Sequence, residues 1–437
     1  MKAATLFAAL GVLSAVVGFS SQKASAPEWT VIVGGQTDGY LSPCGCTKPM
    51  SGGIRRRVSA IRQLATGNAL ILDSGGLAVA AGPQDEMKAD ALAETLVSAK
   101  ADAVLLSGAD AVLGVANLSS LTTRLDGRLL SGSVTPSDRL PVVPSITKGP
   151  FTVGGVLVNP AAFRALGESA RGFAEAAEEF IAQLPSGAVP ILLTDGGKEA
   201  ATTLAEQNPD LRLVVFRQTG EPLAAPIRVG KTLLVTVGEQ GKHVLRFQFQ
   251  DGALTEYRAI RLGPEYDDDP KVAVIYQTYL RRVADAGLLD ALPRTVTDRY
   301  VGSEACLPCH TQEHAIWKGS RHATALKTLE ADGHQRDPDC VSCHVVGLDS
   351  ESGFRSREKT PTLTDVGCES CHGPGERHAR EPKRFPFKKA GEDSCTGCHR
   401  GSTSPNFDFL TYWKKIQHGP VENQRISSGQ EKIKKSR

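Results

Sequence analysis

Four short segments in the last third of the chain carry two cysteines and a histidine in the same order and spacing. They read Cys306-Leu-Pro-Cys309-His310, Cys340-Val-Ser-Cys343-His344, Cys368-Glu-Ser-Cys371-His372 and Cys395-Thr-Gly-Cys398-His399. The pattern C-x-x-C-H is the attachment signal for c-type haem. Two thiols one helical turn apart can bond to the two vinyl groups of one porphyrin, and the adjacent histidine then reaches the iron. The spacing therefore predicts four covalently bound haem c groups, with the eight cysteines as anchors and the four histidines as proximal iron ligands.

The same cysteines allow two other interpretations. Four C-x-x-C pairs could supply two zinc sites with four thiolates each, and an exported protein could use its cysteines for disulfides. Neither interpretation explains why a histidine follows the second cysteine of every pair. Disulfides inside C-x-x-C pairs would also be redox-active rather than structural, so the sequence favours haem attachment.

Five further histidines lie in the same region and could bind an iron from the opposite side. They are His314, His322, His334, His378 and His418. Because His314 comes one helical turn after His310, it would share that residue's face of a helix, which favours an ordinary exposed histidine there. His334 precedes Cys340, and its role stays open.

The region around these motifs has little aliphatic material for a conventional core. From Tyr300 onward, apolar strand-like segments disappear while Cys, His, Gly and Pro accumulate. Four porphyrins within about 100 residues would supply the missing apolar volume and would lie close together, which is the usual arrangement for passing electrons.

The preceding part of the chain alternates strand-like and helix-like segments. We expect strands at Thr30–Gly34, Ala69–Asp73, Ala103–Ser107, Gly155–Asn159, Pro190–Thr194, Leu211–Phe216, Thr232–Val237 and Val244–Phe249. We expect helices at Gly53–Leu64, Glu86–Ser98, Ala161–Leu184 and Lys198–Asn208. Continuous aliphatic strands are typical of sheets buried on both faces, so the alternation predicts a layered α/β domain. The short turn Gly238–His243 predicts that the last two strands form an antiparallel hairpin.

Composition divides the chain into five parts. We expect a signal peptide at 1–26, the α/β domain at 28–262, and a linker with an amphipathic helix (Lys271–Leu292) at 263–298. A haem-binding domain of helices and loops follows at 299–420, and a basic tail at 421–437. The signal peptide is indicated by Lys2, the apolar run Leu6–Phe19 and the small residues Ala24-Ser25-Ala26. That run is shorter than the roughly 20 residues of a spanning helix, so we expect cleavage near Ala26 and export to the periplasm.

The balance of charged residues gives no argument that the chain binds nucleic acid. The chain has 50 Lys and Arg against 48 Asp and Glu, a formal net charge of +2. No second long apolar run is present, so we expect no stable membrane span. The partners we expect are redox proteins and, at an open haem, a small molecule.

A separate pair of cysteines occurs near the start, in Pro43-Cys44-Gly45-Cys46. A C-x-C pair can form a strained local disulfide or offer two soft thiolates to a metal. The sequence does not choose between these roles for Cys44 and Cys46, which could also lie near a haem and mark a substrate or partner site.

Three motifs accompany the C-x-x-C-H segments: Tyr300-Val-Gly-Ser-Glu-Ala-Cys306, Trp317-x-x-Ser320-x-His322 and Cys368-Glu-Ser-Cys-His-Gly-Pro-Gly375. With the order and spacing of the segments, they resemble the tetrahaem cytochrome c-554 family over about residues 299 to 420. In that family three haems have two axial histidines and one has an open or weakly held sixth position. The resemblance implies His322, His378 and His418 as distal ligands and leaves the haem at His344 as the candidate open site, which His334 could close. Family members carry electrons from hydroxylamine oxidation, which suggests redox nitrogen chemistry as a context.

The α/β part resembles a degenerate 5'-nucleotidase type of calcineurin-like metallophosphoesterase. The resemblance is carried by Gly52-Gly53-Ile-Arg55-Arg56, Leu72-Asp73-Ser-Gly75, Ser107-Gly108-Ala109-Asp110 and Val237-Gly-Glu-Gln-Gly-Lys242. The family's Gly-Asp is replaced by Gly75-Gly76, its Gly-Asn-His-Glu by Gly108-Ala109-Asp110-Ala111, and its Gly-His-x-His by Arg217-Gln218-Thr219-Gly220. His243 is the one histidine of this part. A two-metal site needs several His and Asp ligands, so phosphoesterase activity is improbable.

These observations favour a periplasmic electron carrier over an enzyme. An alternative is a redox enzyme that acts on nitric oxide or hydroxylamine at an open haem. A further alternative, the metal-dependent phosphoesterase, is not supported by the broken motifs.

Overall fold

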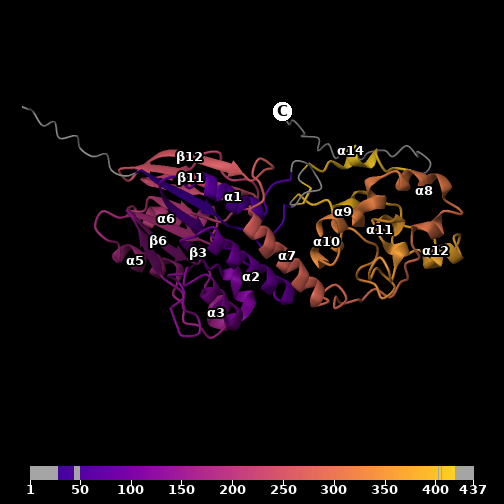
Figure 1. Ribbon diagram of the computed structural model, residues 1–437, viewed down its shortest axis with the longest axis horizontal. Coiled ribbons are helices and arrows are strands. Elements are labelled where there is room, and N and C mark those ends of the chain that lie inside the picture. The colour runs from indigo at the N-terminus through magenta and orange to yellow at the C-terminus, as the bar shows by residue number, and fades with distance from the viewer. Residues whose placement is uncertain (1–27, 44–49, 402, 405, 419–437) are drawn as a thin grey trace, which may run out of the picture.

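The computed structural model describes residues 28–43, 50–401, 403–404 and 406–418. The expected signal peptide, Cys44, Cys46 and the expected basic tail lie outside the described residues. In the described residues, all strands occur before residue 262, and short helices dominate after residue 300 (Figure 1).

Two six-stranded sheets form the first part of the chain. The first sheet has the order β12-β11-β1-β2-β3-β4 and the second β5-β6-β7-β8-β10-β9. The strands are β1 (Trp29–Gly34), β2 (Asn68–Asp73), β3 (Ala103–Leu105), β4 (Leu129–Leu130), β5 (Ser145–Lys148), β6 (Phe151–Val156), β7 (Val189–Thr194), β8 (Leu213–Val215), β9 (Ile227–Val229), β10 (Thr232–Val235), β11 (His243–Gln250) and β12 (Ala253–Arg261). The central strands of both sheets run parallel, while β11, β12, β5 and β9 add antiparallel edges.

The helices of this part are α1 (Ile54–Leu64), α2 (Pro83–Ser98), α3 (Gly114–Arg124), α4 (Ala161–Ala165), α5 (Phe173–Ala182) and α6 (Lys198–Gln207), with the 3₁₀ helix η1 (Gly108–Leu113). Side chains of both sheets and of α1 and α2 share one hydrophobic core, so the sheets pack face to face. Aromatic contacts join the two sheets. The ring centroid of Phe151 lies 5.7 Å from that of Trp29 and 5.1 Å from that of Phe249. A second core packs α5 and α6 on the outer face of the second sheet. The expected layered α/β architecture is therefore confirmed.

The expected hairpin of the last two strands is wrong. β10 pairs with β8 and β9 in the second sheet, whereas β11 pairs with β1 and β12 in the first. The turn at Gly238–Lys242 therefore carries the chain from one sheet to the other, and the hairpin partner of β11 is β12. The sequence did not indicate β12 because most side chains of this strand are exposed. The strand therefore lacks the aliphatic run by which the other strands were predicted.

Two expected helices are shorter than their apolar patterns suggested. The helix expected at Ala161–Leu184 is two helices, α4 and α5, because Gly167 adopts φ 82° after α4. The helix α7 (Pro270–Asp285) ends before Gly287, which has φ 61°, rather than at Leu292. The strand expected at Gly155–Asn159 begins earlier, at Phe151.

The second part of the chain is built from short helices. They are α8 (Thr311–Lys318), α9 (Ala325–Asp332), α10 (Pro338–Val341), α11 (Cys368–His372), α12 (Glu376–Arg380), α13 (Glu392–Thr396) and α14 (Phe409–Trp413). The 3₁₀ helices are η2 (Ser303–Cys306), η3 (Arg321–Thr324) and η4 (Pro361–Leu363). Among the described residues after 299, the buried hydrophobic side chains are Ala325, Leu326, Val341, Val345, Val346, Phe354 and Leu363. So few apolar side chains cannot form a core comparable to that of the α/β part.

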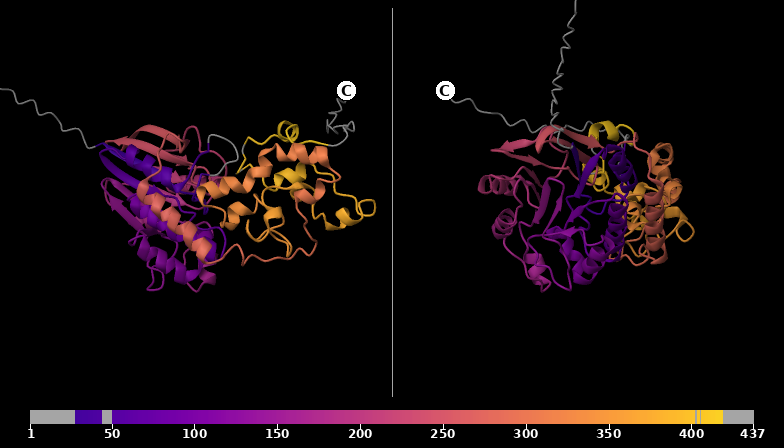
Figure 2. Two further views of the ribbon diagram at one scale, coloured as in Figure 1. Left: turned by 45° about the vertical axis from the view of Figure 1, so that its right-hand side comes forward. Right: turned by 60° about the vertical axis from the view of Figure 1, so that its left-hand side comes forward.

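Helix α7 lies between the two parts and packs on α2 and α1 (Figures 1 and 2). It begins where the Asp269 side chain accepts hydrogen bonds from the backbone N–H of Lys271 and Val272, with Pro270 in the first turn. No helix in the described ranges is both long and apolar enough to span a membrane.

Asp110 fixes the loops at the ends of β2 and β3. Its buried carboxylate accepts hydrogen bonds from the N–H of Leu77, Ala78 and Ser107 and from the Ser107 hydroxyl. Burial raises the pKa of Asp110 to about 6.

We predict that Asp110→Ala lowers the free energy of unfolding by about 3 kcal/mol or more, because it leaves several buried donors without an acceptor. Thermal or urea denaturation of the full chain measures this loss. Asp210→Ala, at an exposed position, is the matched control and should change stability by less than about 0.5 kcal/mol. An equal loss in both variants would contradict the role given to Asp110.

Candidate functional site

Each C-x-x-C-H segment forms a single helical turn. The His310 and His399 N–H groups donate to the carbonyls of Cys306 and Cys395, at 3.0 Å and 2.8 Å. The segments belong to η2, α10, α11 and α13, or directly follow them. A single turn brings the two thiols of a pair to one side of the backbone, as attachment to one porphyrin requires.

Three histidine pairs bring together residues that are far apart in the sequence. The ring centroids are 6.2 Å apart for His310 and His378, 5.9 Å for His372 and His418, and 6.3 Å for His399 and His322. An imidazole nitrogen binds a transition metal at about 2 Å, and the ring centre lies about 1 Å further out, so two rings on one iron have centres about 6 Å apart. All three pairs fit a haem iron with two axial histidines.

Hydrogen bonds at Nδ1 leave Nε2 of these rings available for a metal. The Nδ1–H of His372, His378 and His418 donates to the carbonyls of Lys388, Phe385 and Ile416, each at 2.8 Å. Nδ1 of His399 lies 3.2 Å from the Ser404 hydroxyl, and Nδ1 of His344 lies 2.7 Å from the Ala325 carbonyl. Such second partners fix the tautomer and the orientation of metal-binding histidines. The residues therefore fit haem iron on chemistry as well as on spacing.

Burial supports the neutral form of one pair. It lowers the pKa of His322, with a smaller contribution from His399, and it also lowers the pKa of His399. A neutral imidazole is the form that binds a metal.

His344 has no such ring partner among the described histidines. The His334 ring contacts other groups. Its Nδ1 lies 3.6 Å from the Cys340 thiol, and its two ring nitrogens lie 3.1 Å and 3.3 Å from the Tyr276 hydroxyl. His334 is 7% exposed. The structure therefore brings His334 to the anchor cysteine and to α7 rather than opposite His344.

His314 was expected to be exposed, and this expectation is wrong. The side chain is buried, with its ring against Trp317 and its Nε2 facing Glu304 at 3.4 Å. The turn that carries it packs inward because η2 and α8 contact one another. Its Nε2 already faces a carboxylate, so His314 is a poor candidate for an iron ligand.

Contacts between anchor cysteines give the spatial order of the four segments. The sulfur of Cys306 lies beside that of Cys368. The sulfur of Cys343 likewise lies beside that of Cys398.

The third and fourth segments are joined by Ser394, whose hydroxyl donates to the Cys371 carbonyl at 3.2 Å, and by contacts between α11 and α13. The order in space is therefore first, third, fourth, second.

Sequence reasoning missed Glu369, which lies between the two cysteines of the third segment. Its buried carboxylate accepts hydrogen bonds from the N–H of Val301, Gly302 and Gly375 at 2.7–3.2 Å. Gly375 approaches closely enough that a Cβ there would lie 2.9 Å from the Glu369 Oε1. Glu369 thus ties the backbone before the first segment to the turn after the third. A carboxylate inside a C-x-x-C pair was the signal that could have revealed it.

The second segment lies against the α/β part. The Gln84 side chain donates to Asp337 at 2.7 Å, Tyr279 donates to the same carboxylate at 3.3 Å, and Lys88 forms an ion pair with Asp339. Asp337 also caps α10 by accepting from the Asp339 N–H at 3.1 Å. The residues from α2 and α7 were not singled out by the sequence, because nothing in a lone tyrosine or glutamine marks a contact between distant segments.

Two arginines of the α/β part form ion pairs with carboxylates near the ends of β1 and β2. The buried Arg57 forms an ion pair with Asp73 at the end of β2 and donates to Thr37 at 3.0 Å. Arg217 pairs with Asp38, and a Cβ at Gly76 would lie 2.7 Å from the Asp38 Oδ1 and 3.3 Å from the Arg217 Nη1. Guanidinium groups therefore neutralise both carboxylates, and a side chain at position 76 would be strained because Gly76 has φ 78°.

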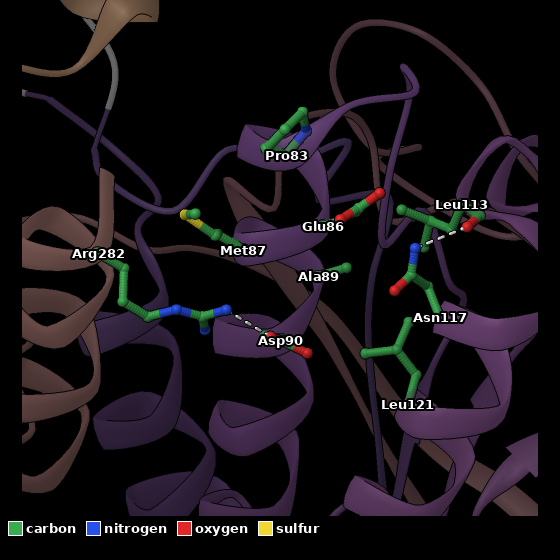
Figure 3. A pocket seen from close by; sticks show the side chains of 9 residues that line it. All are labelled: Pro83, Glu86, Met87, Ala89, Asp90, Leu113, Asn117, Leu121 and Arg282. Atoms are coloured by element: carbon green, nitrogen blue, oxygen red, sulfur yellow. Dashed lines mark hydrogen bonds and ion pairs between the residues drawn. The ribbon is translucent and has the colours of Figure 1, made fainter. Parts of the chain in front are cut away.

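A small pocket of about 160 Å³ lies between α2, α3 and α7 (Figure 3). It is lined by Glu86, Asp90, Asn117 and Arg282 together with apolar side chains, and Arg282 donates to Asp90 at 2.9 Å. It contains no histidine or cysteine, so it is separate from the four segments.

Comparison with known proteins agrees with the helical part. A family model described as "Cytochrome c554 and c-prime" matches residues 305–373. Cytochrome c-554 of Nitrosomonas europaea is 31% identical over 134 residues, which is 23% of this chain and 57% of that protein. The polyhaem cytochrome OmcB of Geobacter sulfurreducens is 31% identical over 87 residues, 19% of this chain and 12% of that protein. These similarities support a c-type cytochrome with more than one haem.

Solved structures agree with the α/β part in fold alone. A 5'-nucleotidase precursor of Thermus thermophilus has a TM-score of 0.50 at 18% identity, covering 70% of this chain and 68% of the other. The NAD nucleotidase of Haemophilus influenzae has a TM-score of 0.50 at 15% identity, covering 65% of each chain. The resemblance to the metallophosphoesterase fold is thereby confirmed.

We predict that the purified chain does not hydrolyse bis-(p-nitrophenyl) phosphate with added Mn²⁺, because its motifs lack the His and Asp ligands that a two-metal site needs. Release of p-nitrophenolate measures turnover. Hydrolysis that requires Mn²⁺ and stops with a chelator would contradict this account.

Proposed function

We propose that this chain is an exported multihaem cytochrome that carries electrons through four haem c groups. The observation that carries the proposal is the set of three histidine pairs at the spacing of two imidazoles on one iron. The four C-x-x-C-H segments and the cytochrome relatives support the same function. Haem c, when bound, supplies one-electron redox chemistry.

We assign the axial ligands by these pairs. His310 with His378, His372 with His418, and His399 with His322 would each hold one iron, while each C-x-x-C pair anchors its porphyrin. The ring contacts support this pairing of the distal histidines, which the sequence left undetermined.

The chain's own contacts favour transfer along one path. The anchor cysteines of the first and third segments touch, as do those of the second and fourth, and Ser394 joins the third segment to the fourth. We propose that the first and second segments are the two ends of this path. The second end lies at the junction with the α/β part.

A second candidate function rests on His344. Because no described histidine ring faces it and His334 is bonded to Tyr276, the iron held by His344 would keep one open position. That position could bind a small redox-active nitrogen compound such as nitric oxide or hydroxylamine, which would make the chain an oxidoreductase.

For the remaining parts we propose three roles. Residues 1–26 would direct export to the periplasm and be removed, and the α/β domain (28–262) would serve as a scaffold that covers the second segment through α2, together with α7 of the linker. Residues 263–298 link it to the haem-binding domain at 299–420.

We predict four haems per chain by pyridine haemochrome assay, with an EPR spectrum of three low-spin irons and one high-spin iron that responds to nitric oxide. His322→Ala, His378→Ala and His418→Ala should each convert one low-spin iron to high-spin, because each removes one ring of a pair.

His334→Ala is the matched control and should leave three low-spin irons. Four low-spin irons in the unaltered protein, with one converted by His334→Ala, would show that His334 closes the second site. The chain would then be a carrier without an open iron.

A further inference from the structure

A basic surface segment lies beside two of the histidine pairs. Residues 376–389 carry six exposed cationic side chains: Arg377, Arg380, Lys383, Arg384, Lys388 and Lys389. The acidic residues of the segment are Glu376 and Glu381, so its formal charge is +4 within a chain of net charge +2. The segment is therefore a local concentration of positive charge.

Backbone carbonyls and one aromatic ring of this segment also contact two of the paired histidines. Its Phe385 and Lys388 carbonyls accept the Nδ1–H of His378 and His372, both at 2.8 Å. The Phe387 ring lies 4.3 Å from the ring of His378 and 5.7 Å from that of His372. A protein bound to the outer side of this segment would thus be separated by one layer of residues from the histidines proposed to bind the first and third haem irons.

The location of the segment leaves it accessible among the residues that the structure describes. Helix α12 lies at the end of the molecule away from the sheets, whereas α10 lies next to α7 (Figures 1 and 2). The second C-x-x-C-H segment is covered by the contacts of Gln84, Lys88 and Tyr279. Leu307, between the two anchor cysteines of the first segment, is 38% exposed and offers an apolar contact at that segment.

We propose that residues 376–389 form the docking surface for an acidic electron-transfer protein, which exchanges electrons at the first and third haem. This inference rests on the proposed function. Complementary charge speeds encounter between redox proteins and sets their orientation, while the interface stays small enough for rapid release.

The charges suit a protein better than a nucleic acid. Arg377, Arg380 and Arg384 are each already held by a carboxylate, at 3.3 Å, 3.1 Å and 3.2 Å. The other cations of the segment, Lys383, Lys388 and Lys389, lie close together in the sequence, whereas a polyphosphate backbone favours a longer basic track.

The test uses a photoreduced acidic flavodoxin as probe and the full haem-loaded chain. We expect binding and the second-order rate of haem reduction to fall as salt is raised, because screening weakens the attraction. The variant Lys383→Glu with Lys388→Glu should reduce affinity and rate by about tenfold at low salt.

Arg228→Glu with Lys231→Glu changes the net charge equally at exposed positions of the α/β part and is the control. It should change affinity and rate less than about twofold. Full reduction of every variant by dithionite, with unchanged absorbance, shows that the haems and the fold are intact.

Equal losses in both double variants, or rates independent of salt, would overturn the docking surface while leaving the proposed carrier intact. If the purified chain showed no haem absorbance, or if dithionite did not change that absorbance, the proposed function itself would be overturned.

Discussion

A shortage of apolar side chains is the constraint on which the helical part depends. Seven buried hydrophobic residues stand among the described residues after 299, against two large hydrophobic cores in the α/β part. The short helices are joined instead by hydrogen bonds, chiefly those that the Glu369 carboxylate accepts from backbone N–H groups and those that histidine Nδ1–H groups donate to carbonyls. A buried carboxylate that accepts several backbone N–H groups can hold loops that lack a core. In our account, covalently bound porphyrins complete that interior.

The two parts of the chain divide stability and redox chemistry between them. The α/β part has the sheets of a metallophosphoesterase fold, and its Arg57 and Arg217 form ion pairs with carboxylates. Helices α2 and α7 contact the segment that contains His344. The Tyr276 hydroxyl of α7 lies 3.1 Å and 3.3 Å from the ring nitrogens of His334. A shared fold does not by itself assign a shared function.

Sequence patterns predicted the parts that depend on local chemistry. The C-x-x-C-H spacing named the candidate anchors and proximal histidines, and aliphatic runs located most strands, because both signals lie within a few residues. Pairings between distant segments could not be predicted: β11 pairs with β1 and β12 rather than with β10, and the rings of His310 and His378 meet although the two residues are far apart in the sequence. The burial of His314 was missed because helical spacing alone does not tell which face meets a neighbour.

The most direct test of the central claim is to locate the irons in crystals of the haem-loaded chain by anomalous scattering at the iron edge. The account predicts four iron peaks per chain, three of them midway between the paired rings of His310 and His378, His372 and His418, and His399 and His322. The fourth should lie beside His344 with no histidine opposite. Fewer than four peaks, or irons that pair these histidines differently, would contradict the account.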